Sequence, residues 1–248
     1  MLFGRKKQKL PALYTDAERA ALEAHITKYF GKIDTVIRDG DSPDISVDIA
    51  VISPTSERNF FTLVTIGMGA YRMGTPSKAS KYGISLDYAE LIICLPPNWN
   101  MQSILAGAIH DEQWYWPTKL LKDTARIPLN DSILIDQGSF FSAKRPYANN
   151  TNLCGVLATA PECDFDYNPD EDKYSDVCVM PSGKEVNLYQ LVPLYRNEIE
   201  FLNKYTDTVN DEETRFFDYL YSRGAFENSG LSMIVDINRK SIIDYIDK

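Results

Sequence analysis

The sequence predicts an α+β fold, in which a mixed or antiparallel β-sheet is flanked by helices. Short runs of apolar and β-branched residues show the alternation typical of strands. Helical patterns precede, separate and follow groups of these runs, and they do not alternate regularly with single strands as in a βαβ array. No internal repeat and no clear linker interrupts the 248 residues. One domain with peripheral additions is therefore expected.

The N-terminal part of the chain predicts a helix followed by a β-hairpin. Thr15 and Glu18 have the spacing of a capping box, and apolar residues follow at helical spacing until Gly31, which favours a helix end. Ile45–Ser53 alternates with apolar residues on one side, which predicts a half-buried strand. Phe60–Ile66 is rich in aromatic and β-branched residues, so it predicts the second strand of the hairpin.

The rest of the chain predicts further strands around one helix. The polar, glycine-containing segment Gly67–Tyr88 is expected to be a covering loop. Trp114–Ala125 predicts a helix with its apolar face against the sheet. Strand character is also present in Ala89–Leu95, Ser132–Asp136, Leu153–Ala160, Val177–Met180 and Val186–Leu191, and helical character in Glu198–Tyr205 and Glu212–Tyr221.

Charge and composition exclude several classes of function. The net charge of -9 disfavours nucleic acid as a partner, because that affinity depends on Lys and Arg, and it favours a basic protein partner. The basic N-terminal cluster is followed by no apolar region long enough for a signal peptide, and no stretch is long enough to span a membrane. The four cysteines are too sparse for a disulfide framework. A cytoplasmic protein with free thiols is expected.

Candidate catalytic residues are scarce. His25 and His110 are the only histidines, and the consecutive residues His110, Asp111 and Glu112 do not face one another on a helix. No Gly-x-Ser-x-Gly motif supplies a nucleophile, and the glycines at 67 and 69 lack the spacing and the Lys of a phosphate-binding loop. The sequence therefore predicts no enzyme, no cofactor and no metal centre.

Two surface segments are candidates for partner binding. The acidic stretch 162–176 alternates oxygen ligands as the start of a calcium loop does, but Pro169 occupies the position that needs Gly and Ser175 the position that needs Glu. A solvated loop, a docking surface for a basic partner and a cation site remain open interpretations. Met, Tyr and Arg in the covering loop could also form contacts. The candidate partner-binding residues are Asp164, Asp166, Asp170, Glu171, Asp172, Tyr71 and Arg72.

Three patches together resemble the suppressor of fused domain family. The first is Phe61–Thr65 followed by Gly67-Met68, the second is Ala89–Ile93 leading to Leu95-Pro96-Pro97 and Trp99, and the third is Asn187–Tyr195 with Glu198 one helical turn later. Trp114, Trp116 and Pro117 lie between the second and third patches, where that family also carries Trp and Pro before a helix. The resemblance implies an α+β protein-binding domain without a catalytic constellation. It covers about 48–201, and the residues after about Tyr205 depart from it.

The resemblance also implies two functions. Bacterial relatives are proposed to be immunity proteins that neutralise polymorphic toxins, and this branch matches the length of the chain, so an immunity protein with a basic toxin partner is predicted. The alternative is an adaptor that binds an extended peptide along a sheet edge, as the animal member encloses a transcription-factor peptide. The predicted organisation is a single domain over 1–248, with a core at 30–205 and a C-terminal helical and strand extension at 206–248. No pattern specifies an oligomeric state.

Overall fold

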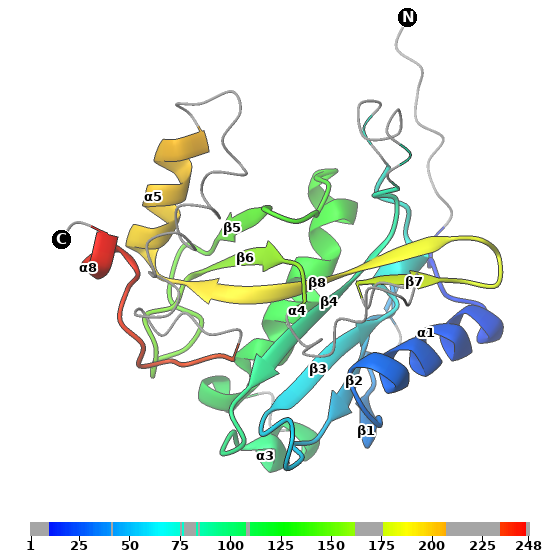
Figure 1. Cartoon of the computed structure of the whole chain (residues 1–248), viewed down its shortest axis with the longest axis horizontal. Coiled ribbons are helices and arrows are strands. Elements are labelled where there is room, and N and C mark those ends of the chain that lie inside the picture. Colours follow the sequence, from blue (N-terminus) through cyan, green and yellow to red (C-terminus); the bar gives the residue numbers. More distant parts are fainter. Residues whose placement is uncertain are drawn as a thin grey trace, which may run out of the picture.

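One mixed sheet forms the centre of the molecule, with helices on both faces (Figure 1). The computed structural model describes residues 10–40, 42–74, 76, 83, 85–107, 110–161, 176–206 and 234–246. The elements are α1 (Asp16–Tyr29), β1 (Thr35–Ile37), β2 (Asp48–Ile52), β3 (Phe61–Ile66), η1 (Met68–Ala70), β4 (Ala89–Leu95), α3 (Met101–Leu105), α4 (Glu112–Asp131), β5 (Phe140–Ser142), β6 (Gly155–Thr159), β7 (Val177–Val179), β8 (Glu185–Leu194), α5 (Arg196–Thr206) and α8 (Ile243–Ile246).

The strand order confirms the predicted mixed sheet. The strands follow the order β1-β2-β3-β4-β8-β6-β5, and β7 pairs with β8 outside this path. Each pair is antiparallel except β4 and β8, which run parallel. β8 pairs with β4 through Asn187–Gln190 and with β6 through Gln190–Leu194. It therefore joins the two halves of the sheet.

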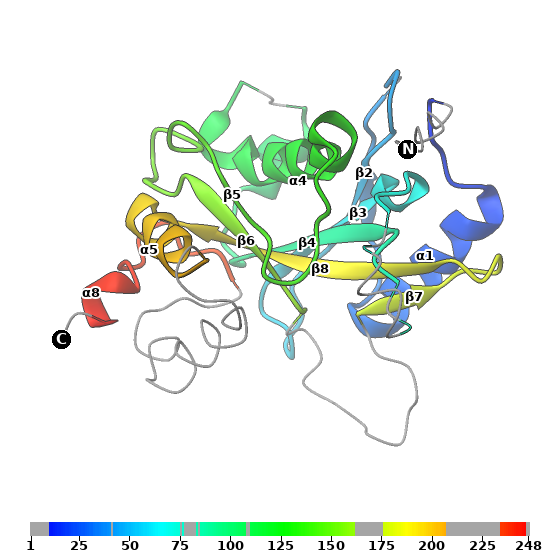
Figure 2. The same cartoon turned by 90° about the horizontal axis from the view of Figure 1, so that it is seen from above.

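Helices cover both faces of the sheet, so that helix, sheet and helix form three layers (Figure 2). Tyr189 and Leu191 of β8 belong to the core cluster under α4 and α3. Leu188 belongs to the cluster under α1, and Val192 and Leu194 belong to the cluster under α5. Because side chains alternate along a strand, α1 and α5 lie over one face and α4 over the other.

The N-terminal helix and the hairpin form as predicted, but the hairpin is more deeply buried. Thr15 and Glu18 complete a capping box, and α1 ends at Tyr29 with Phe30 as its C-cap, followed by Gly31 with φ 113°. β2 and β3 pair antiparallel. The prediction of a half-buried β2 was wrong, because α1 covers its second face and each residue of Asp48–Ile52 is buried.

The central helix is longer than predicted, since α4 contains both Pro117 and Pro128. Pro117 has no N–H for the carbonyl four residues earlier, which is that of Gln113. Asn150 Nδ2 donates to this carbonyl from outside the helix at 3.5 Å. Burial of Trp116, Leu120, Leu121 and Ala125 against the sheet also holds the helix in place.

One predicted strand was wrong and several short elements were not predicted. Residues 132–136 form no strand, because Ser132 ends α4 in the left-handed conformation (φ 57°) and Ile135 is buried without a ladder partner. The strand of this region is β5, further along the chain. β1, α3 and α8 were also missed. The predicted helix at 212–221 lies outside the described residues.

The C-terminal segment 234–246 packs against the sheet and α5. Ile234 forms a parallel bridge with Cys94, and Val235 N–H donates to Cys94 O at 2.9 Å. Cys94 lies beyond the residues of β4 that pair with β8, so this bridge fills the gap where the two strands separate. Ile242 is buried in the cluster under α5. The division at residues 205 and 206 stays a prediction.

Candidate functional site

The sheet has an open edge at β5. Ala143 N–H donates to Cys154 O, and Ala158 N–H donates to Ser139 O. The backbone N–H and C=O groups of successive residues point to opposite sides of a strand. The N–H and C=O groups of Phe140 and Ser142 therefore point away from β6. Within the described ranges, no strand pairs with this side of β5. In this part of the chain the outward donors and acceptors of β5 are therefore unpaired and accessible to another chain.

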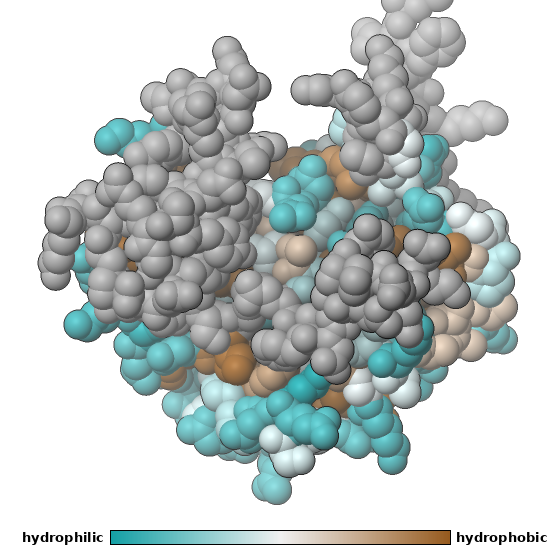
Figure 3. Space-filling model, in the orientation of Figure 1, coloured by the Kyte–Doolittle hydropathy of each residue, from teal (hydrophilic) through white to brown (hydrophobic). Residues whose placement is uncertain are grey.

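An apolar groove of about 850 Å³ lies beside this edge, between β5 and α4. Leu120 and Ile127 come from the helix, and Phe141 and Val156 come from the strands. Phe141 points into the groove, whereas the preceding Phe140 packs on the opposite face under α5. Where Figure 3 colours the face that carries α1 and α5, hydrophobic side chains form small patches separated by hydrophilic ones.

A second, more polar pocket of about 660 Å³ lies on the α5 side. It is lined by the start of α5, by the C-terminal segment and by residues next to β6, and Pro146 lines both this pocket and the groove. Both faces of the sheet are therefore hollowed next to the open strand. The lining residues used below are Arg196, Glu200, Lys240 and Asp244.

An aromatic cluster borders the groove. The rings of Trp116 and Tyr147 stack with centroids 5.3 Å apart, and Trp99 meets both Trp114 and Trp116 edge to face. Trp99 Nε1 donates to Trp114 O at 3.0 Å. These are the three tryptophans of the chain. Their fluorescence should therefore respond to a ligand in the groove.

Asp39 fixes the middle of α4 to the loop before β2. Its carboxylate lies 2.8 Å from Lys122 Nζ and 2.6 Å from Arg126 Nη2, and it accepts from Val47 N–H. Arg126 also donates to Ile45 O. Burial raises the pKa of Asp39, but the bonds from Lys122, Val47 and Arg126 outweigh this effect and lower it to about 2. The ionised carboxylate therefore stabilises the position of the helix.

Replacing Asp39 with Asn should lower the free energy of unfolding by about 2 kcal/mol at neutral pH. The pKa in the folded protein is below the ordinary 3.8, so this stabilisation is present above pH 3.8 and is lost as the pH falls towards about 2. Urea unfolding of both proteins across this range measures the difference. The exposed Glu57 replaced with Gln is the control, and a difference that does not depend on pH would contradict the assignment.

A buried ion pair holds the C-terminal segment against α5. Arg239 Nη1 and Nη2 donate to the two oxygens of Glu198, each at 2.6 Å, and both side chains are at most 4% exposed. The same carboxylate accepts from the backbone N–H groups of Tyr195 and Ile242, and Arg239 also donates to Pro193 O. The carboxylate of Glu198 therefore holds the C-terminal segment, which lines the pocket on the α5 side, against α5.

A second buried carboxylate, Glu90, holds the turn after β3. Tyr14 Oη, Gly67 N–H and Gly69 N–H donate to its Oε1, and Thr65 Oγ1 donates to its Oε2. All of these partners of Glu90 lie within the fold. Gly67 has φ 135°, and a Cβ there would lie 1.8 Å from a backbone oxygen, so glycine is required by the geometry of this turn.

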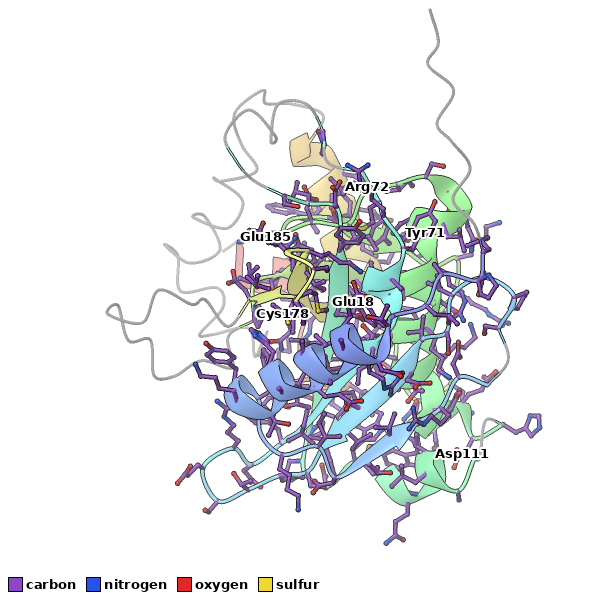
Figure 4. All side chains as sticks on the ribbon, turned by 90° about the vertical axis from the view of Figure 1, so that its right-hand side faces the viewer. Glu18, Tyr71, Arg72, Asp111, Cys178 and Glu185 are labelled. Atoms are coloured by element: carbon purple, nitrogen blue, oxygen red, sulfur yellow. The ribbon has the colours of Figure 1, made fainter. Side chains whose placement is uncertain are left out.

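The candidate residues named from the sequence lie elsewhere or outside the described residues. Tyr71 and Arg72 follow η1 and lie side by side, far from Asp111 at the start of α4 (Figure 4). Arg72 forms an ion pair with Asp87 at 2.9 Å, and neither Tyr71 nor Arg72 lines the groove or the pocket. His110 is exposed. The acidic candidates Asp164, Asp166, Asp170, Glu171 and Asp172 lie outside the described residues.

The groove residues were not recognised as a site from the sequence. Leu120 was assigned only to the sheet-facing side of a helix, and Phe141 lay outside each predicted strand. Among the described residues, no group of three or more His, Cys, Asp and Glu side chains could hold a metal ion. None of the helices in the described ranges combines the length and hydrophobicity of a membrane span.

Comparisons with known proteins agree with this fold. The family model described as Suppressor of fused protein (SUFU) matches residues 43–240. The structure of a suppressor of fused homologue from Neisseria gonorrhoeae FA 1090 is similar, with a TM-score of 0.54, 18% identity, and coverage of 91% of this chain and 96% of that chain. A chain of the Sufu-Fu complex is similar with a TM-score of 0.57, 11% identity, and coverage of 93% and 94%. No curated protein matches this chain in sequence.

Proposed function

The chain belongs to the suppressor of fused family, and we propose that it is a non-catalytic, cytoplasmic binding protein that takes an extended segment of a partner protein along β5. The observation that carries this proposal is the open edge of β5 beside an apolar groove. The outward N–H and C=O groups of Phe140 and Ser142 supply main-chain hydrogen bonds, and the groove supplies a place for an apolar side chain. One structural neighbour was solved in a complex, named as that of Sufu with Fu.

Ser142→Pro is expected to weaken peptide binding at least about tenfold, because proline removes an outward N–H and its ring blocks the open side. Proline is tolerated on edge strands, and Ser142 lies between the residues that bond to β6, so the fold should persist. Binding is measured by tryptophan fluorescence with peptides selected from a displayed random library on the full chain.

Ser142→Ala keeps the N–H and is the matched control, which should bind as the original protein does. Thermal unfolding checks that both variants remain folded. Equal affinity of the proline variant for the selected peptides would refute binding along β5. An absence of any selected peptide would refute peptide binding as such.

The second candidate function is an immunity protein that neutralises a bacterial toxin. The acidic stretch 162–176 and the net charge of -9 support it, because opposed charge would steer a basic toxin to the protein and block its substrate. The similarity to a bacterial homologue is consistent with this role. A toxin bound through the acidic stretch would bind the Ser142→Pro variant unchanged, would associate more slowly in high salt, and would need its whole folded domain.

A further inference from the structure

Basic side chains gather at the downstream end of the open strand. Lys144 and Arg145 lie two and three residues after the end of β5, and Arg145 lines the groove on the α4 side. Arg196 and Lys240 line the pocket on the opposite face, and Arg196 Nη2 donates to Lys144 O at 3.2 Å. Pro146 borders both hollows. Three separate segments of the chain therefore bring exposed cations to the same end of β5.

The acidic side chains that line the groove and the pocket do not fully cancel the positive charge of these Lys and Arg side chains. Asp123 is paired with Lys119, and among the described residues that line the groove the remaining acidic side chain is Glu112, in the first turn of α4. Glu200 and Asp244 line the pocket, where they balance Arg196 and Lys240, and the third cation of the pocket, Arg239, is paired with Glu198. Lys144 and Arg145 are then opposed by Glu112 alone, which leaves a local excess of one positive charge among the described residues. This excess is opposite in sign to the net charge of -9.

We infer that the open edge selects a partner segment that combines an apolar side chain over Phe141 with an acidic side chain at the end beside Lys144 and Arg145. This inference rests on the proposed function and adds the chemistry of the segment. Side chains of an added strand alternate between the two faces of the sheet. Consecutive residues would therefore face the apolar groove and the polar pocket in turn, and an acidic residue near Pro146 meets cations on either face.

The test is a selection of displayed random ten-residue peptides on the full chain, in parallel with a charge-reversed variant. That variant carries Arg145→Glu, Arg196→Glu and Lys240→Glu. Peptides selected on the original protein should carry alternating apolar residues and an acidic residue near one end. They should associate with the variant at least about tenfold more slowly, and high salt should reduce this difference.

Lys32→Glu, an exposed change next to β1 at the opposite end of the sheet, is the matched control and should leave the selection unchanged. The milder changes Arg145→Gln and Lys240→Gln serve if the triple variant unfolds. Selected peptides that depend on the N–H of Ser142 but show no acidic preference would overturn this inference alone. Peptides that bind independently of Ser142, or no selected peptides, would overturn the proposed function as well.

Discussion

Replacing Arg239 with Ala is expected to lower the free energy of unfolding by about 3–5 kcal/mol, because it leaves the carboxylate of Glu198 buried without its cation. Two charge-assisted hydrogen bonds to Glu198 and the bond to Pro193 O are lost together. The ring of Tyr195 also loses its contact with the guanidinium, whose centre lies 4.6 Å away. Urea unfolding at neutral pH measures the change.

The neighbouring residue provides the control for this prediction. Lys240 is exposed, so Lys240→Ala should change the free energy of unfolding by less than about 0.5 kcal/mol. Because the ion pair joins residues 41 positions apart, its loss should also release the C-terminal segment to added protease. A cost below about 1 kcal/mol for Arg239→Ala, or unchanged proteolysis, would mean that packing alone holds the segment.

Replacing Glu90 with Ala should cost a similar amount, about 3–5 kcal/mol, because it leaves several buried donors without an acceptor. These donors are the hydroxyls of Tyr14 and Thr65 and the N–H groups of Gly67 and Gly69. Through Glu90, these donors connect the residue Tyr14 before α1, strand β3 and the turn at η1. Urea unfolding measures the loss, and amide exchange at Gly67 and Gly69 should accelerate.

Glu90→Gln is the matched control for this change. Burial raises the pKa of Glu90 even though four hydrogen bonds favour its ionised form. An uncharged amide of the same shape avoids that cost of burial and keeps one oxygen for Tyr14, Gly67 and Gly69. The Gln variant should therefore lose less than half of what the Ala variant loses. Equal losses would show that the charge itself, and not the acceptor, is required.

Local sequence patterns correctly predicted those helices and strands that are stabilised by residues close together in the chain. The capping box of Thr15 and Glu18 starts α1, and alternating apolar residues form the hairpin of β2 and β3. The second and third sequence patches that resemble the suppressor of fused family lie in β4 and β8. Their neighbourhood in a parallel pair was not predicted, because pairing between distant strands leaves no periodic pattern in either strand.

The candidate site was missed for a related reason. β5 has only three residues, Phe140–Ser142, too few to show an alternation, and the apolar residues at 133–135 suggested a strand at the wrong place. The groove exists only when β5 and α4 come together in the fold. The net charge also suggested a basic partner. It does not reveal that Arg145 lines the groove on one face of an edge strand while Arg196 and Lys240 line the pocket on the other.

The pairing of Ile234 with Cys94 also has a kinetic consequence. It joins two segments that are far apart in the chain, so its formation closes a very long loop. Contacts of this kind form late, after local hairpins and helices have collapsed. They are also the first to open when few backbone bonds hold them. The amide of Val235, whose hydrogen bond to Cys94 O closes the gap between β4 and β8, would report this early opening separately from global unfolding.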